Sequence, residues 1–174
     1  MNIFKTYWYS YLKYRFTGDM DILISYYKKK GMIIGNNCKI YSGIATPESY
    51  LIKLGNNITI ATGVKFITHD NSISKIYSEF SDIFGKIEIE DNCFIGAYSI
   101  IMPGVVLGKN TIVAAGSIVT KSFLGDEVIG GVPAKKICSI DNYKSRIKQY
   151  GMNVLGLSEQ EKKELVLNGK LIKR

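Results

Sequence analysis

The sequence predicts an all-β solenoid from about Ile34 to Val132, a parallel β-helix of six-residue repeats with short helical segments at both ends. Two observations carry this prediction. The first is an aliphatic residue at every sixth position without a gap, at Ile89, Ile95, Ile101, Leu107, Val113 and Val119. The second is the return of this spacing upstream, on either side of a two-residue slip around Pro47, at Ile34, Ile40, Leu54, Ile60 and Phe66. Neither a hairpin sheet nor an α-helix keeps such a period.

Each repeat is expected to form one short strand and one tight turn. Three repeats would complete a triangular coil whose aliphatic side chains point inward, and each strand would pair with the coils above and below it at about 4.8 Å. Since a single coil cannot bury its own apolar face, stacking supplies the core. The residue types that suit the turns recur at the expected places: Gly104, Gly116, Asn36-Asn37, Asn56-Asn57 and Asp91-Asn92.

The two ends of the chain read as helical. A helix over Phe4 to Phe16 would place Phe4, Trp8, Tyr11 and Leu12 on one face, and Asp19 or Asp21 could begin a second helix that runs to Lys30. Near the other end, Ser158 to Glu161 reads as a capping box before a helix through Leu167, after an irregular stretch from Ser139 to Gly156. We therefore divide the chain into a helical cap (1–33), a β-helix domain (34–138) with an excursion loop (70–86), and a tail (139–174).

Composition narrows the class of protein. The 174 residues are 46% hydrophobic and 22% charged, which suits one principal domain. No apolar run reaches the roughly 18 residues of a membrane span and no signal-peptide pattern opens the chain, so we expect a cytoplasmic protein. The cysteines Cys38, Cys93 and Cys138 lack the spacing of a disulfide framework or a zinc site.

A formal net charge of +8 favours an anionic partner. Nucleic acid is excluded as the primary partner because no recognition motif accompanies the charge. The aromatic and basic N-terminal helix allows peripheral contact with a membrane, although packing of that helix on the solenoid explains the same face and is favoured.

Three segments, together with the repeats, resemble the hexapeptide-repeat acetyltransferases. They are Phe66-Ile67-Thr68-His69-Asp70, Gly116-Ser117-Ile118-Val119-Thr120-Lys121 and Gly130-Gly131-Val132-Pro133-Ala134-Lys135. The likeness covers about Ile34 to Ile137. It is greatest to the branch with maltose, galactoside and serine O-acetyltransferases and the O-acetyltransferases of capsule and lipopolysaccharide synthesis. Each motif alone is weak, whereas their order and spacing together are specific.

The resemblance implies a left-handed coil and a homotrimer, with acetyl-CoA bound between neighbouring subunits and a saccharide as acceptor. It also implies that His69 is the general base, because the family's catalytic histidine begins an excursion from the coil, and His69 follows the inward position Phe66 by three residues. A neutral imidazole can take a proton from a hydroxyl near pH 7. The chain has one histidine, so no other can compete.

A catalytic histidine needs a partner that fixes its tautomer, and the sequence leaves this partner open among Asp70, Glu79, Asp82 and a backbone carbonyl. The excursion loop carries Tyr77, Phe80 and Phe84. These aromatic side chains suit either the face of an acceptor sugar or packing against a neighbouring subunit, and the sequence does not choose between the two.

The remaining site residues follow from the resemblance alone. The backbone N–H at Ala97 would stabilise the thioester oxygen, although galactoside-type members have a serine there, and Tyr41 replaces an asparagine that binds their acceptors. The family pattern places the cofactor along Ala97, Ala115 and Gly116, with its nucleotide end near Thr120, Lys121 and Lys135. No metal is expected.

Other functions remain as alternatives. A serine O-acetyltransferase would normally have a large N-terminal helical domain, and an N-acetyltransferase of nucleotide-linked amino sugars would use similar histidine chemistry. The zinc site of a γ-type carbonic anhydrase needs three histidine ligands from neighbouring coils, and this chain has one histidine, which argues against that enzyme. A non-catalytic solenoid that serves as a binding module would be indifferent to the loss of His69.

Overall fold

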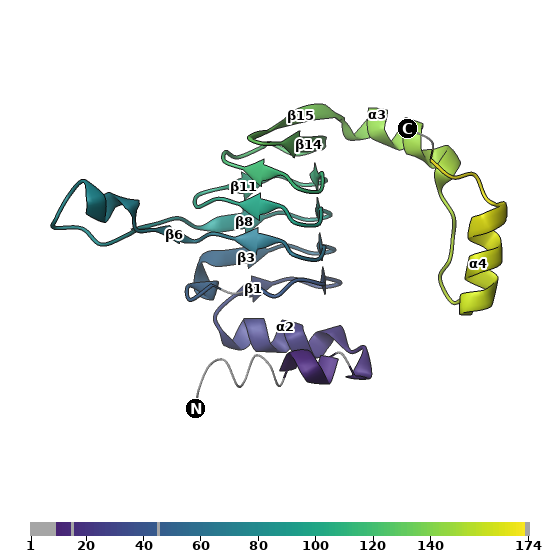
Figure 1. Cartoon of the computed structure of the whole chain (residues 1–174), viewed down its shortest axis with the longest axis horizontal. Coiled ribbons are helices and arrows are strands. Elements are labelled where there is room, and N and C mark those ends of the chain that lie inside the picture. Colours follow the sequence, from purple (N-terminus) through teal and green to yellow (C-terminus); the bar gives the residue numbers. More distant parts are fainter. Residues whose placement is uncertain (1–9, 15, 45, 173–174) are drawn as a thin grey trace.

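The computed structural model describes residues 10–14, 16–44 and 46–172. Its centre is a stack of short parallel strands, with a long arm projecting on one side and a helical tail on the other (Figure 1). The strands of the stack are β1 (Ile33–Ile34), β2 (Lys39–Ile40), β3 (Ile52–Leu54), β4 (Thr59–Ile60), β5 (Lys65–Phe66), β8 (Ile87–Ile89), β9 (Phe94–Ile95), β10 (Ile100–Ile101), β11 (Val106–Leu107), β12 (Ile112–Val113) and β13 (Ile118–Val119).

The strands form three parallel sheets that the chain visits in turn. Sheet A has the order β1-β3-β8-β11, sheet C the order β13-β10-β5, and sheet B runs β2-β4-β9-β12 before it continues into a hairpin. Successive strands thus belong to A, B and C and then to A again, and all of these pairings are parallel. The predicted stacking of repeats is confirmed, whereas the left-handed sense of the coil stays a prediction.

The six-residue period arises because each two-residue strand turns its second side chain inward. In sheet B the inward residues Ile40, Ile60, Ile95 and Val113 lie in one register and are fully buried. The corners between sheets contain residues in the left-handed conformation, including Asn37, Asn57, Asn92 and Asn110. Asparagine tolerates this conformation better than most residues, so the amides mark the turns of successive coils.

Helix α2 (Met20–Lys29) closes the N-terminal end of the stack, as predicted. Asp19 caps it by accepting a hydrogen bond from the Asp21 N–H, and Leu23 and Tyr27 are buried beneath β1 and β2. Residues 10–14 and 16–17 are also helical. In that segment Tyr11 packs against the core and Leu12 is half exposed, while Phe4 and Trp8 lie outside the described residues.

The C-terminal end differs from the prediction. Strands β14 (Glu127–Gly131) and β15 (Ala134–Ser139) form an antiparallel hairpin on sheet B. The stretch from Ser139 to Gly156 was expected to be irregular, but it begins with helix α3 (Ile140–Ile147) and continues into the 3₁₀ turn Lys148–Tyr150. That prediction was wrong. Ile140, Tyr143 and Ile147 recur at helical spacing, and the Ser139 N-cap accepts from the Asn142 N–H, so both signals of a helix were present although α3 buries no side chain.

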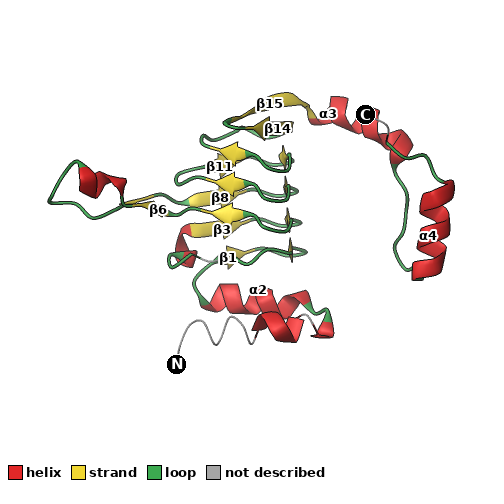
Figure 2. Cartoon of the chain, viewed as in Figure 1, coloured by secondary structure: helices red, strands yellow, loops and turns green. Residues whose placement is uncertain are grey.

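Helix α4 (Glu159–Asn168) confirms the predicted capping box, in which Ser158 and Glu161 bond reciprocally. Together α3 and α4 form a tail that leaves the stack at the hairpin (Figure 2). No helix in the described part of the chain is long and apolar enough to cross a bilayer.

Two departures from the regular coil occur near one another. The described residues of the first coil form no strand in sheet C; after Thr46 the chain passes through Pro47 into the 3₁₀ turn Ser49–Leu51. The second departure is the arm, in which β6 (His69–Asp70) and β7 (Ile83–Phe84) pair antiparallel around the 3₁₀ turn Ser72–Lys75. The arm leaves the stack after β5 and returns before β8 (Figure 1).

Replacing Ile95 with alanine should lower the free energy of unfolding by about 2–5 kcal/mol. Ile95 is fully buried, and its strand β9 lies between β4 and β12, so neighbouring coils cannot collapse into the space that the substitution leaves. Urea unfolding followed by circular dichroism measures the change. The exposed neighbour Phe94 provides the matched control, since Phe94→Ala should cost less than Ile95→Ala.

Candidate active site

His69 lies where the arm leaves the stack, and its imidazole is held by a carboxylate from the preceding coil. The Nδ1 atom of His69 is 2.9 Å from Oε2 of Glu48. The Glu48 side chain is 14% exposed and that of His69 is 39% exposed, so the carboxylate is largely enclosed while the ring reaches solvent. The pair therefore joins a fixed anion to an accessible imidazole.

Two threonines complete the network behind the histidine. The Thr68 hydroxyl donates to Glu48 Oε2 at 2.8 Å and lies 2.5 Å from the Thr46 hydroxyl. Because a hydroxyl has one proton, Thr68 donates it to Glu48 and accepts from Thr46. Hydrogen bonds thus run from Thr46 to Thr68 to the carboxylate, and Thr68 itself is buried.

These contacts decide the protonation of the pair. Partial burial raises the pKa of Glu48, but hydrogen bonds from Thr68 and His69 outweigh burial, and the pKa of this carboxyl falls below its ordinary value. An ionised carboxylate can only accept hydrogen bonds, so the proton of the neutral imidazole is on Nδ1. The lone pair on Nε2 is then available as a base.

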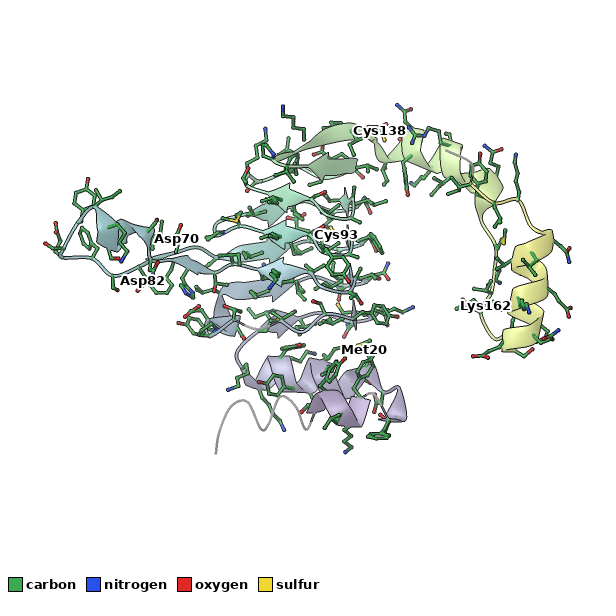
Figure 3. The ribbon with its side chains drawn as sticks, in the orientation of Figure 1. Met20, Asp70, Asp82, Cys93, Cys138 and Lys162 are labelled. Atoms are coloured by element: carbon green, nitrogen blue, oxygen red, sulfur yellow. The ribbon has the colours of Figure 1, made fainter. Side chains whose placement is uncertain are left out.

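Glu48 was not among the predicted partners of His69, and the structure corrects that choice. The Asp70 carboxylate instead accepts a hydrogen bond from the Ser72 N–H at 2.8 Å and stabilises the turn that opens the arm. Figure 3 shows Asp70 and Asp82 on the arm, which projects away from the stack. The signal that could have found Glu48 is the slip of the repeat at Pro47, directly before it in the sequence.

The predicted aromatic residues of the arm divide into two groups. Phe84 lies beside the histidine, with a ring centroid 6.0 Å from that of His69. Tyr77 and Phe80 lie farther out and contact each other edge to face at 6.2 Å. All three side chains are more than half exposed, so the arm offers an apolar surface that no described residue covers.

A second group of predicted site residues lies at the other end of the sheet C strands. We call the corner between sheets B and C, which precedes those strands, the B–C corner. There the Gly116 N–H donates to the Ala97 carbonyl at 2.8 Å, and Ala115 lies in the same turn as Gly116. The Ala97 N–H has no hydrogen-bond partner among the described residues. Lys135, exposed on β15, pairs with Gly130 above this corner.

The corner between sheets C and A, where the sheet C strands end, is here the C–A corner. It holds His69 after β5 and the pair Thr120 and Lys121 after β13. The Lys121 ammonium lies 5.7 Å from the centroid of the Phe123 ring. The single chain thus places His69, Thr120 and Lys121 at one corner and Ala97, Ala115 and Gly116 at the other.

The strands of sheet C separate the two corners. The gap is spanned by Ser99 to Met102, of which Ile100 and Ile101 form β10, and three steps of extended chain at about 3.3 Å each correspond to roughly 10 Å. Groups that act on one reacting carbonyl must lie within a few ångströms of it.

No group of acidic, histidine or cysteine side chains in the described part of the chain could hold a metal ion.

Comparison with known proteins shows the family of this chain. A family model described as the hexapeptide repeat of succinyl-transferase matches residues 86–121. Protein CapG of Staphylococcus aureus is 44% identical over 147 residues, which cover 81% of this chain and 85% of that protein. The chain belongs to the hexapeptide-repeat acetyltransferase family. As a member of this family the protein is an acyltransferase.

Two further proteins are similar to this hexapeptide-repeat protein, one over a shorter stretch of sequence and one in fold. Galactoside O-acetyltransferase of Escherichia coli is 30% identical over 110 residues, 63% of this chain and 54% of that enzyme. The chain thus spans about half the length of that relative. A solved maltose O-acetyltransferase from Clostridium difficile has a TM-score of 0.54 at 21% identity, over 79% of this chain and 87% of that one, and it shows the shared fold.

Removing the Thr68 hydroxyl should destabilise this hexapeptide-repeat protein. Thr68→Val keeps the shape of the side chain but leaves the Thr46 hydroxyl and the Glu48 carboxylate each without one partner. Thr46 keeps a longer hydrogen bond to Glu48 at 3.4 Å and Glu48 keeps its contact with His69, so two hydrogen bonds are lost, one of them to a charged group. We expect the free energy of unfolding to fall by about 1–3 kcal/mol. Thr68→Ser restores the hydroxyl and should recover most of the loss; equal losses in the two variants would show that the methyl group, and not the hydroxyl, matters.

Proposed function

We propose that the protein transfers an acetyl group from acetyl-CoA to a hydroxyl of a saccharide, in the biosynthesis of a surface polysaccharide. The observation that carries this proposal is the Glu48–His69 pair, which leaves Nε2 of a solvent-accessible imidazole free to act as a base. Similarity to galactoside O-acetyltransferase supports the class of acceptor. Cytoplasmic action and the left-handed coil belong to the same proposal.

The chemistry assigned to His69 is general-base catalysis in a direct ternary complex. When bound, acetyl-CoA supplies the acetyl group as a thioester. Nε2 of His69 takes the proton of the acceptor hydroxyl as its oxygen forms the new C–O bond, and returns that proton to the sulfur when the C–S bond breaks. Glu48 holds the ring by Nδ1 and stabilises the imidazolium between these two steps.

The B–C corner has the features needed to hold the donor. The unpaired Ala97 N–H can donate to the oxygen that becomes negative during attack. The backbone around Ala115 and Gly116 is open, because a side chain added at Gly116 would meet no atom within 4 Å. The exposed amine of Lys135 suits the phosphates of CoA, as does that of Lys121 at the C–A corner, while Lys136 is engaged with Glu127 at 3.4 Å.

A shared site follows from the separation of the two corners. If His69 and the Ala97 N–H act on one thioester, they must come from different copies of the chain, since sheet C separates them within one copy. A closed ring of identical subunits pairs one surface of each copy with a different surface of the next. We therefore place the active site between the C–A corner of one subunit and the B–C corner of its neighbour, in a homotrimer.

Acetyl-CoA turnover, followed as release of free thiol, tests the proposed function. The protein is assayed with a panel of hexoses, oligosaccharides, nucleotide sugars, nucleotide-linked amino sugars and serine, and without an acceptor as control. A rate that depends on a saccharide supports the proposal. Acetyl transfer to serine alone, or to an amino sugar alone, would show that the acceptor is not a saccharide hydroxyl. Failure to bind CoA would favour a non-catalytic solenoid.

A further inference from the structure

A cavity of about 420 Å³ continues the B–C corner toward the N-terminal end of the stack. Its volume lies in the range of small-molecule sites. Residues from the first two coils and the N-terminal helix line it: Tyr11, Tyr41, Ser42, Gly43, Thr62, Gly63, Val64 and Lys65. The Tyr98 N–H donates to the Thr62 carbonyl at 2.9 Å, so the turn that holds Ala97 lies directly above the cavity wall.

Two tyrosines offer aromatic surface at this cavity. Tyr41 is 48% exposed, and Tyr98 is 70% exposed in the coil above. The Tyr98 ring lies on Gly63 so closely that a Cβ added to Gly63 would come within 2.6 Å of two ring atoms. Tyr98 also has a φ of +59°, which is rare for a residue other than glycine. A strained turn thus holds a large exposed ring at the edge of the cavity.

Lys65 gives the cavity a positive charge. It is the outward residue of β5 and is exposed. None of the residues that line the cavity is acidic, and no carboxylate in the described part of the chain forms a salt bridge with Lys65. The ammonium is therefore available to an anionic ligand, and the serine and threonine hydroxyls of the lining offer additional hydrogen bonds.

We propose that this cavity binds an anionic sugar unit of the acceptor, with its apolar ring faces against Tyr41 and Tyr98 and its carboxylate or phosphate paired with Lys65. Aromatic rings favour the apolar faces of sugars, and an unpaired lysine favours an acidic sugar over a neutral one. The proposal rests on the proposed function in one respect: the bound sugar is part of the acceptor only if the protein acetylates a saccharide. It adds the charge of the substrate, which the catalytic pair does not specify.

Equilibrium dialysis against matched sugar pairs tests the charge preference without catalysis. The probes are glucuronate, galacturonate and mannuronate, each paired with its parent hexose, and glucose 6-phosphate paired with glucose. We expect at least one acidic sugar to bind about tenfold tighter than its neutral parent, the effect of one charged hydrogen bond. The carboxylate and phosphate pairs then identify which anion the site takes.

Variants assign the preference to the cavity. Lys65→Gln should abolish the difference within the preferred pair, Lys65→Arg should keep it, and Tyr98→Ala should weaken both members of the pair. Lys109→Gln, which removes one exposed lysine from another corner of the stack, is the matched control and should leave the preference unchanged. Equal binding within every pair, or a preference that survives in Lys65→Gln, would overturn the proposal.

The outcome separates this proposal from the proposed function. Acetyl transfer to neutral sugars without any preference for acidic ones would retain the acetyltransferase and remove the anionic subsite. If an acidic sugar binds in a way that depends on Lys65 but no acceptor is acetylated, the anionic binding site is supported and the proposed saccharide acetyltransferase activity is contradicted.

Discussion

Replacing His69 with alanine is expected to lower kcat for acetyl transfer by about 10³-fold, within the range of about 10² to 10⁴ for loss of a general base. His69 is the only histidine in the chain, and its Nε2 is free because Glu48 holds Nδ1. Thiol release at saturating acetyl-CoA and acceptor measures the loss. Because the ring is placed at the reacting hydroxyl and not on the nucleotide, binding of CoA measured by calorimetry should change little.

Asp70→Asn is the matched control for this substitution. Asp70 is the next residue, carries a charge and belongs to the same strand, but its carboxylate contacts Ser72 and not the imidazole. We expect Asp70→Asn to retain kcat within a few-fold of the wild type. An unchanged kcat in His69→Ala would exclude His69 as the general base. An equal loss of kcat in the two variants would indicate that both substitutions disturb the structure of β6, where the arm begins.

Replacing Glu48 with glutamine is expected to lower kcat by about 10²-fold with little change in KM. Glutamine has a similar shape but no negative charge, so the imidazolium formed during the reaction loses its stabilising partner. The amide can also present its NH₂ group to Nδ1, which would favour the wrong tautomer. Steady-state kinetics with both substrates varied measures the split between kcat and KM; an effect on KM alone would make Glu48 a substrate-binding residue.

The same variant should change how stability depends on pH. The pKa of Glu48 is lowered in the folded protein, so its contribution is complete above the ordinary value of 4.5 and is lost as pH falls through the lower folded-state pKa. The difference in free energy of unfolding between wild type and Glu48→Gln should therefore shrink as pH falls below about pH 4.5. Urea titrations from about pH 5.5 downward measure it. A difference that grows below about pH 4.5 would contradict the sign.

The repeat predicted the core well because one simple rule governs it. Each coil must bury one aliphatic residue per strand, so residues such as Ile95 and Val113 show their inward direction through spacing alone. His69 became a candidate through the resemblance to the family, whose catalytic histidine begins an excursion from the coil. Glu48 was missed because its contact with His69 joins two irregular segments, 21 residues apart, whose side-chain directions no period fixes.

Helix α3 shows a second limit of this approach. Its apolar residues Ile140, Tyr143 and Ile147 recur at helical spacing over only eight residues and none of them is buried, so this short signal and the capping serine were overlooked. The arm shows a third limit. The sequence identified Tyr77, Phe80 and Phe84 as aromatic residues of a long loop, but not that Phe84 would lie beside the imidazole while the other two extend from the stack.

The reversal of chain direction at β14 and β15 has a consequence for the behaviour of the protein in concentrated solution. A stack of parallel strands ends in unpaired N–H and C=O groups, and such open edges recruit further chains into fibres. Here α2 packs beneath β1 and β2, while β15 runs antiparallel and presents the exposed Lys135 and Lys136. Both ends of sheet B are therefore covered, and we expect this sheet to resist end-to-end growth into fibres.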